Sequence, residues 1–366
     1  MKFNIKRDLL LPGIQIVNGV IERRHTLPIL SNLLMSVDRK SIKLTGTDME
    51  VELICTIQND NQEESEFTLP GRKLLDICRA LPEDSVMDFQ VDKDQVVLKS
   101  GRSRFTLATL PAKDFPGTEI SNALVTFTIS QGDLKSLVED TMFAMAQQDV
   151  RYYLNGLLLE INGDTLRAVA TDGHRLALKD IEVKTGSNEQ QQIIIPRKGV
   201  IEIARLLENS EETVQVQVTK NHIRLNINSI QFTSKLIDGK FPDYERVIPK
   251  ASDTPLLAKR DALKQSLTRA SILSNEKYRG VRIILKKDSL KALAHNPEQE
   301  EAEEELEVQY SGGEMEIGFN VTYLLDAINA IKTENVVMTT TSPDSSCLLL
   351  PEGKSNYKYV VMPMRL

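Results

Sequence analysis

The segment Ala168-Val169-Ala170-Thr171-Asp172 indicates how the chain is organised, because the sequence repeats its pattern at a fixed interval. Leu44-Thr45-Gly46-Thr47-Asp48 stands 124 residues before it, and Ala292-Leu293-Ala294-His295-Asn296 stands 124 residues after it. Each copy is a short apolar run that ends in Asp or Asn, which is typical of a strand entering a turn. Three copies at one spacing indicate three repeated domains, each about a third of the 366-residue chain.

Two amphipathic helices accompany each copy. Apolar residues spaced by three and four positions predict one buried face per helix. The first helix of each unit carries Leu10/Gly13/Ile14/Val17, Leu134/Leu137/Val138 and Leu263/Leu267/Ala270, behind Asp8, Asp133 and Asp261. The second carries Leu74/Ile77/Cys78/Leu81, Val200/Ile203/Ala204/Leu207 and Leu324/Ala327/Ile328/Ile331. Pro70 and Pro196 stand where the second helix can begin in the first two units.

The remaining segments alternate polar and apolar residues, as half-buried antiparallel strands do. Val125-Thr126-Phe127-Thr128-Ile129 is one example. A further marker, Arg104-Phe105-Thr106-Leu107, returns as Gln231-Phe232-Thr233-Ser234 and as the terminal strand 357–361. The fold class is therefore α+β, with three domains of two helices on antiparallel sheets. We place their boundaries at residues 1–121, 122–250 and 251–366.

Composition indicates a cytoplasmic protein. Hydrophobic residues make up 41% of the chain and charged residues 27%, and no run approaches the ~20 apolar residues that span a membrane. The start, Met1–Lys6, has no apolar signal core. Cys55, Cys78 and Cys347 are scattered, which favours buried thiols in a reducing compartment over disulfides or a zinc site.

The net charge of −7 comes from one segment. Seven glutamates lie between positions 298 and 307, and the rest of the chain holds 45 acidic and 45 basic residues. We interpret the cluster as a solvated acidic face, because it lacks the alternating Asp and Gly spacing of a calcium loop. Basic surfaces elsewhere stay compatible with nucleic acid.

No catalytic motif is present. The four histidines share no metal-binding spacing, and no phosphate-binding or nucleophile motif occurs, so we expect neither a metal nor another cofactor. Asp172-Gly173-His174-Arg175 has two interpretations. His174 is a general base in the first, and the segment is a tight turn in the second.

Basic residues recur on the second helix of two units. Arg72, Lys73 and Arg79 lie on the first, and Arg197, Lys198 and Arg205 lie on the second. Such residues either solvate a helix face or follow the phosphates of a nucleic acid without reading its bases.

Geometry favours a ring of six domains. A domain of this size has a radius of gyration of about 14 Å, so three closed in a ring leave a hole of roughly 5 Å and six leave one on the order of 35 Å. Duplex DNA needs on the order of 20 Å, which a head-to-tail dimer supplies. Closure needs complementary ends. The expected interface joins Lys73, Arg102, Arg104, Phe105 and Leu107 to Ile272, Leu273, Glu298, Glu300, Glu301 and Glu304.

The whole chain resembles the bacterial DNA polymerase sliding clamps, the beta subunits of DNA polymerase III. The resemblance is carried by Leu44–Asp48, by Asp149-Val150-Arg151-Tyr152-Tyr153-Leu154-Asn155-Gly156, by Ala170-Thr171-Asp172-Gly173-His174-Arg175-Leu176 and by the C-terminal segment 360–366. It implies a ring-shaped homodimer that encircles duplex DNA, confers processivity on the replicative polymerase and catalyses no reaction. Implied partners are the polymerase, the clamp loader and other proteins with a clamp-binding motif.

The resemblance also implies two sites. The partner pocket maps onto Leu154, Thr171, Gly173, His174, Arg175, Leu176, Pro242, Arg246, Val247, Ser346, Val360, Val361, Met362, Pro363, Met364 and Arg365. DNA contacts map onto Arg24, Arg72, Gln148, Tyr152 and Tyr153, supported by Arg79, Arg197, Lys198, Arg205 and Arg282. The terminal strand also has a plainer interpretation, in which it completes the last sheet.

Two other hypotheses stay open. One is a repeat-built scaffold that binds peptides without encircling DNA, which a monomer in solution would favour. The other is an enzyme that uses Asp172 and His174. It would lose turnover, but not peptide affinity, when His174 is replaced.

Overall fold

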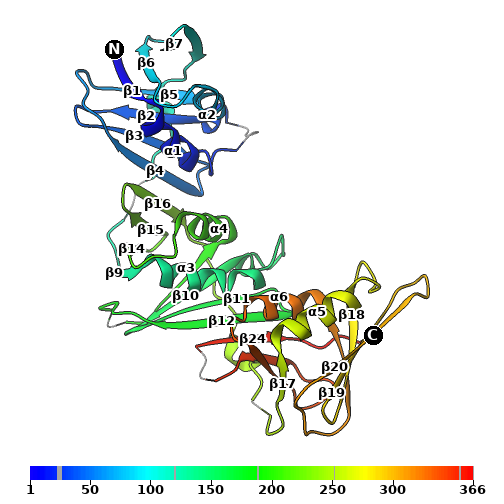
Figure 1. Cartoon of the computed structure of the whole chain (residues 1–366). Helices are drawn as coiled ribbons and strands as arrows, with labels where there is room; N and C mark the ends of the chain where they lie inside the picture. The colour runs from blue at the N-terminus through cyan, green and yellow to red at the C-terminus, as the bar shows by residue number, and fades with distance from the viewer. Residues whose placement is uncertain (23–26, 119–120, 188, 251, 354–355, 366) are drawn as a thin grey trace. The chain divides into compact units, whose positions relative to one another are not determined.

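The computed structural model describes residues 1–22, 27–118, 121–187, 189–250, 252–353 and 356–365. In these residues each repeat runs strand, helix, four strands, helix, three strands (Figure 1). The first repeat comprises β1 (Lys2–Lys6), α1 (Arg7–Val17), β2 (Asn32–Val37), β3 (Ser41–Thr47), β4 (Val51–Gln58), β5 (Ser65–Pro70), α2 (Gly71–Ala80), β6 (Val86–Val91), β7 (Gln95–Ser100) and β8 (Ser103–Ala108).

The second and third repeats follow the same order. The second comprises β9 (Val125–Ser130), α3 (Gln131–Glu139), β10 (Gly156–Asn162), β11 (Thr165–Thr171), β12 (Arg175–Glu182), β13 (Gln191–Pro196), α4 (Arg197–Leu206), β14 (Thr213–Val218), β15 (His222–Ile227) and β16 (Ile230–Lys235). The third comprises β17 (Leu256–Lys259), α5 (Arg260–Ser271), β18 (Gly280–Lys286), β19 (Ser289–His295), β20 (Glu301–Glu307), β21 (Met315–Asn320), α6 (Val321–Ala330), β22 (Asn335–Thr339), β23 (Cys347–Pro351) and β24 (Tyr357–Val361).

The helices bury the faces that their spacing predicts. In α1 the buried residues are Leu10, Gly13, Ile14 and Val17, which is the whole predicted set. Each fully buried leucine or isoleucine contributes about 1.5–3 kcal/mol to the free energy of folding. Asp8 and Asp261 lie in the first turn of α1 and α5, but the N-cap residues are the preceding lysines, without a side-chain cap bond. The acidic residues therefore act on the helix dipole rather than as caps.

The strands form two long sheets that two repeats share. One has the order β5-β2-β3-β4-β16-β15-β14-β9, and the other has the order β13-β10-β11-β12-β24-β23-β22-β17. Strand β4 thus pairs with β16 of the second repeat, and β12 pairs with β24 of the third. The plainer interpretation of the terminal strand needs a correction, because β24 also pairs with a strand of the second repeat.

Two shorter sheets remain, β1-β6-β7-β8 and β20-β19-β18-β21. The chain forms two compact units, and each holds one long sheet and one short sheet. Unit 1 comprises residues 1–135, 184–186 and 198–236, and unit 2 comprises residues 136–183, 187–197 and 237–366. Because the long sheets cross from repeat to repeat, the compact units do not follow the repeats, and our domain boundaries stay a prediction.

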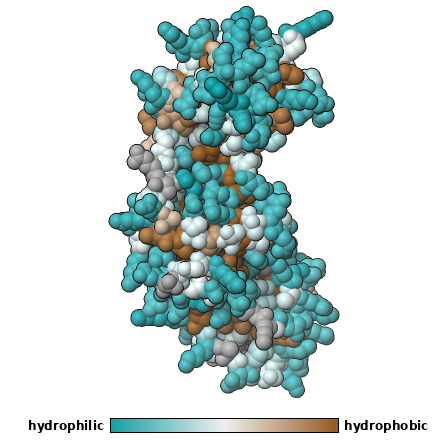
Figure 2. All heavy atoms as spheres, turned by 90° about the vertical axis from the view of Figure 1, so that its left-hand side faces the viewer, coloured by the Kyte–Doolittle hydropathy of each residue, from teal (hydrophilic) through white to brown (hydrophobic). Residues whose placement is uncertain are grey.

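The glutamate cluster is part of a strand. Strand β20 spans Glu301–Glu307, although glutamate is depleted in strands. Its odd-numbered residues are exposed, whereas Ala302, Glu304 and Leu306 are half-buried on the face against α5. On the molecular face shown in Figure 2, hydrophilic side chains predominate and hydrophobic ones lie in small patches between them. None of the helices in the described ranges is long and apolar enough to cross a membrane.

Candidate functional site

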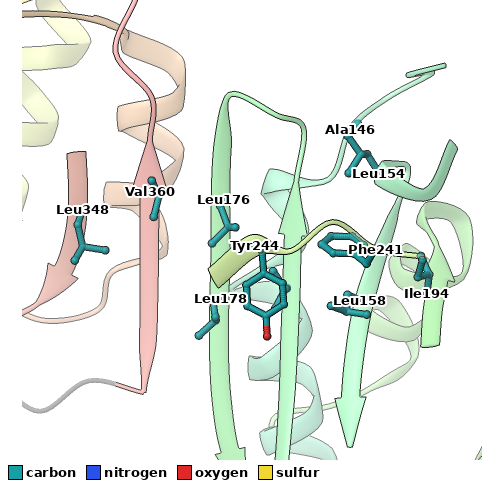
Figure 3. Packing of buried hydrophobic residues seen from close by; sticks show 11 residues of the cluster. Ala146, Leu154, Leu158, Leu176, Leu178, Ile194, Phe241, Tyr244, Leu348 and Val360 are labelled. Carbon is teal, nitrogen blue, oxygen red and sulfur yellow. The ribbon is translucent and has the colours of Figure 1, made fainter. Parts of the chain in front are cut away.

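The predicted partner pocket lies entirely in unit 2. Leu154, Leu176 and Val360 of the predicted set belong to one buried cluster, which also includes Phe241 and Tyr244 and is called the floor below. Figure 3 shows Tyr244 and Phe241 over the strands that carry Leu176, Leu178 and Leu158, with Val360 on the neighbouring strand. Phe241 and Tyr244 were not predicted in this pocket, because they come from a segment that only tertiary packing brings to it.

The rim of the pocket is accessible. Val247 is 37% exposed, and Pro242, Arg246 and His174 are exposed. Met362, Pro363 and Met364 are half-buried and Arg365 is exposed, so the tail offers methionine side chains at the surface. Ser346 is half-buried and immediately precedes β23. Val361 is buried like Val360, so these two valines stabilise the floor rather than the rim. An apolar floor with a flexible methionine rim suits an apolar side chain of a bound peptide.

The turn at Asp172 is built by hydrogen bonds. Asp172 Oδ1 accepts from the backbone N–H groups of His174 at 2.9 Å and Arg175 at 3.0 Å. Thr171 Oγ1 donates to the carbonyl of Arg175 and accepts from the N–H of Gly173. Gly173 has φ of +90°, and a Cβ there would lie 3.0 Å from Arg151 Nη2. This position therefore needs glycine.

The turn geometry argues against an acid–base pair. Asp172 Oδ2 accepts from Arg175 Nε at 3.0 Å, so both carboxylate oxygens are engaged away from the imidazole. The His174 ring instead lies parallel to the Tyr323 ring, with centroids 6.4 Å apart. The backbone carbonyl of His174 accepts a hydrogen bond from the N–H of Met362 at 2.9 Å. The tight-turn interpretation of this segment is confirmed. In the described part of the chain, no group of three His, Cys, Asp or Glu residues could hold a metal ion.

Arg175, a residue of the predicted pocket, is mostly buried. Its side chain is 13% exposed, donates to Asp326, and lies 4.5 Å from the centroid of the Tyr323 ring. It therefore fixes α6 against the turn more than it lines the surface. Tyr323 and Asp326 were missed because they come from a helix far away in sequence.

Tyr244 is held by a polar network beneath the pocket. Its hydroxyl donates to Glu160, and Arg167 Nη1 donates to the same hydroxyl at 3.1 Å. Burial and the neighbouring Glu160 raise the pKa of Tyr244 to about 12. The hydroxyl therefore keeps its proton at physiological pH and can donate to Glu160. These hydrogen bonds anchor the segment that carries Pro242 and Val247.

Local hydrogen bonds and an ion pair shape the loop with the predicted DNA contacts Gln148, Tyr152 and Tyr153. Asn155 accepts from the N–H of Asp149 and donates to its carbonyl, and Arg151 pairs with the Asp149 carboxylate at 2.9 Å. Arg151 holds the pKa of Asp149 at about 2, below its ordinary value of 3.8. The loop presents exposed Gln148 and Tyr152, the latter 57% exposed, while Tyr153 is half-buried.

The predicted basic residues differ in their neighbours. Arg72 and Arg79 are exposed on α2. Lys198 pairs with Glu22 and Asp48, and Arg205 donates to the carbonyl of Ile16, so these two stabilise the contact between the first two repeats. Arg197 donates to the carbonyl of Met145, and Arg282 on β18 pairs with Glu316. Arg24 lies outside the described residues.

The predicted interface residues lie on or beside the outer strands of the two short sheets. Arg104, Phe105 and Leu107 belong to β8, Arg102 to the preceding turn and Lys73 to α2. Glu301 and Glu304 belong to β20, and Glu298 and Glu300 precede it. Glu304 pairs with Arg269 within the chain, at 2.6 Å. Ile272 follows α5 and is 72% exposed, and Leu273 is half-buried.

Comparison with known proteins places the whole chain in one family. Models of the DNA polymerase III beta subunit match it in three parts: the N-terminal domain over residues 1–119, the central domain over 128–243 and the C-terminal domain over 245–365. The beta sliding clamps of Pseudomonas putida and Escherichia coli are 52% and 50% identical to it, over 100% of each chain.

Solved structures agree with this assignment. The DNA polymerase III subunit beta of Pseudomonas aeruginosa is 51% identical, with a TM-score of 0.97 over 100% of both chains. A sliding clamp of the same species, bound to griselimycin, has a TM-score of 0.96 over 100% of both chains. These relatives do not favour a scaffold without DNA. With its three-domain clamp fold, the chain belongs to the DNA polymerase III beta subunit family, the beta sliding clamps.

Proposed function

We propose that this protein is a DNA sliding clamp, a non-catalytic ring-shaped homodimer that encircles duplex DNA and tethers the replicative polymerase. The observation that carries the proposal concerns the edge strands β8 and β20, each of which pairs on one side alone in the described residues. They are the repeat counterparts of strands that join one repeat to the next, so the chain contains its own template for joining them. The clamp loader and other proteins with a clamp-binding motif would share the partner pocket. The cytoplasm is the expected location.

The template is the joint between consecutive repeats. In unit 1, β4 pairs with β16, with Leu53 opposite Phe232. In unit 2, β12 pairs with β24, with Ala177 opposite Tyr359. The repeat counterparts of these strands are β20 and β8, which pair in the described residues only with β19 and β7. A second copy of the chain can supply the missing partner to each.

The same register can be transferred to the edges. Phe105 lies opposite Leu98 as Phe232 lies opposite Leu225, which makes Phe105 and Phe232 counterparts. Glu301 follows the β19 turn in the place that Glu52 holds after β3. In the dimer, Ala302 then faces Phe105 of the second copy and Glu303 faces its Arg104. Opposite charges at directly opposed positions stabilise such a pair of strands.

Burial supports the transfer. Phe232 and Tyr359 are fully buried in their joints, whereas Phe105 is half-buried. Phe143 lies twelve residues after the start of α3 and packs edge-on against Tyr359, with ring centroids 5.3 Å apart. Ile272 lies twelve residues after the start of α5. Its 72% exposure therefore marks the place where Phe105 of the second copy would pack.

The test is retention on DNA. The protein is loaded onto nicked circular DNA by its ATP-dependent loader, and retention is measured before and after the circle is cut once. Retention on the circle and loss from the linear form would support topological linkage. Equal retention on both forms would mean that direct binding holds the protein, and the clamp proposal would be wrong.

A further inference from the structure

A hollow of about 380 Å³ lies in the third repeat, outside the floor of the partner pocket. Asn275, Tyr278, Leu293 and His295 line it, together with Met364 and Arg365 of the C-terminal tail. Tyr278 is 55% exposed, and Leu293 and Met364 are half-buried. Apolar side chains that are left partly uncovered around a concave site are typical of a binding site.

The second repeat contains the covered counterpart of this hollow. Leu154 precedes Gly156 of β10 by two residues, as Tyr278 precedes Gly280 of β18. Val169 precedes the turn residue Asp172 by three positions, as Leu293 precedes Asn296. Leu154 is 2% exposed and Val169 is fully buried, in contrast to Tyr278 and Leu293. Side chains at equivalent positions are therefore buried in the second repeat and partly exposed to solvent in the third.

The second repeat closes this place with an aromatic residue. Phe241 belongs to the buried cluster that contains Ala146, Leu154 and Val169, and Figure 3 shows it between Tyr244 and Ile194. The N–H of Ile237 donates to the carbonyl of Ile194, and that of Met364 donates in the same way to Gly318, both at 2.9 Å. Ile237 and Met364 are thus counterparts. Phe241 lies four residues beyond Ile237, and it packs in the buried cluster at the place that is hollow in the third repeat.

We propose that the hollow is a docking site for an aromatic side chain, carried by an extended segment of a partner peptide, in the place that Phe241 fills in the second repeat. The internal occupant is Phe241-Pro242-Asp243, an aromatic residue with an acidic residue two positions later. Exposed Arg365 and His295 at the rim favour the same order of residues in the partner.

The hollow shares two residues with the predicted partner pocket. Met364 and Arg365 line the hollow and are also residues of the predicted pocket. A peptide anchored in the pocket can therefore extend along the tail into the hollow, and the second anchor would raise its affinity without a second molecule. The inference rests on the proposed function in one respect, since the clamp's partner proteins supply the segment.

The probe is a synthetic peptide with the sequence of residues 238–246, in which a benzophenone amino acid replaces Phe241. After irradiation with the full-length protein, mass spectrometry locates the cross-links. We expect them at Met364, Tyr278 or Leu293. An unlabelled peptide of the natural sequence should compete at least tenfold better than one in which alanine replaces Phe241.

Two variants and one control make the test specific. Leu293→Glu places a charge in the hollow and should reduce the cross-link yield at least fivefold, and Tyr278→Ala, at an exposed position, serves if that variant folds poorly. Ile201→Glu, on an exposed part of α4, should leave the yield unchanged. Cross-links at Leu158 or Ile194 would show that the peptide displaces the internal segment instead, and scattered cross-links would show no site. Either result overturns the inference.

The retention assay separates this inference from the proposed function. A protein that is retained on circular DNA but does not cross-link the probe lacks the docking site and remains a clamp. A protein that cross-links the probe at the hollow but is equally retained on circular and linear DNA has the site without the clamp function.

Discussion

Single residues hold the two loops that face the predicted ligands. Arg151 pairs with Asp149, and its Nη2 donates to the carbonyl of Asp172, so one guanidinium links the DNA-contact loop to the turn of the partner pocket. The Asp-Gly-His turn was predictable from sequence because its hydrogen bonds are local. Tyr323 and Asp326 were not, because only tertiary packing brings α6 to the turn.

The Asp149 carboxylate should titrate near pH 2. Its pKa in the folded chain lies below the ordinary value of 3.8, chiefly because Arg151 donates to it. The stability that the Asp149 carboxylate gives to the folded loop is therefore fully present above pH 3.8, and it is lost as the pH falls through 2. Carboxyl-carbon NMR of the protein should give this midpoint. In the variant Arg151→Ala the midpoint should return towards 3.8, and an unchanged midpoint would exclude Arg151 as the cause.

Replacing His174 should weaken partner peptides and leave the dimer intact. The variant His174→Ala removes an exposed aromatic side chain that the bound peptide would contact. One such contact is worth about 0.5–1.5 kcal/mol, so affinity should fall by roughly two- to tenfold. Fluorescence anisotropy with a clamp-binding segment of the polymerase measures the change. Sedimentation should still show a dimer. Unchanged peptide affinity would remove His174 from the pocket.

At the scale of elements, spacing predicts the helices well and the strand pairing poorly. All six predicted helices are present in the described residues, because their buried faces follow from local periodicity. Strand β20 was not expected, since glutamate rarely forms strands. The pairing of β24 with β12 was also missed, because register between repeats is set by long-range packing and leaves no local pattern.

The joint between two copies should depend on Ile272 and Leu273. The double variant Ile272→Ala, Leu273→Ala removes the apolar side chains that would pack on β8 of the second copy. Burial of two such residues is worth about 3–6 kcal/mol per joint. The dissociation constant of the dimer should therefore rise at least a hundredfold. Sedimentation equilibrium measures it. The control Ile201→Ala, also an exposed apolar residue, should stay dimeric, and a dimeric double variant would refute the transferred register.

At the scale of the whole molecule, the cations on the helices differ in whether an acidic residue already pairs with them. The resemblance implies a DNA contact at Arg72 and a supporting role for Lys198, but Lys198 is engaged by Asp48 and Glu22. Arg72 is exposed and has only a weak pair with Asp76, at 3.7 Å. Repetition therefore predicted where cations lie on the helices, and not which of them are already neutralised.

Arg72 should contribute to the salt dependence of DNA binding. Each phosphate contact adds about 0.9 to the slope of log K against log salt, so Arg72→Ala should reduce the slope by about one to two in a dimer. Binding to a short duplex over a range of ionic strength gives this slope. Arg246→Ala, an exposed residue paired with Asp243 at the pocket rim, should leave it unchanged. An unchanged slope for Arg72→Ala would mean that Arg72 does not reach a phosphate.

The glutamate-rich edge strand β20 also disfavours contact between two like ends of the chain. Two β20 edges brought together would oppose rows of carboxylates, and two β8 edges would oppose Arg104 and Arg102, so like ends repel. Only unlike ends attract. An assembly built from unlike ends has a direction, and it either closes on itself or grows as an open filament. A change in the curvature of a single joint would therefore convert a closed particle into a polymer.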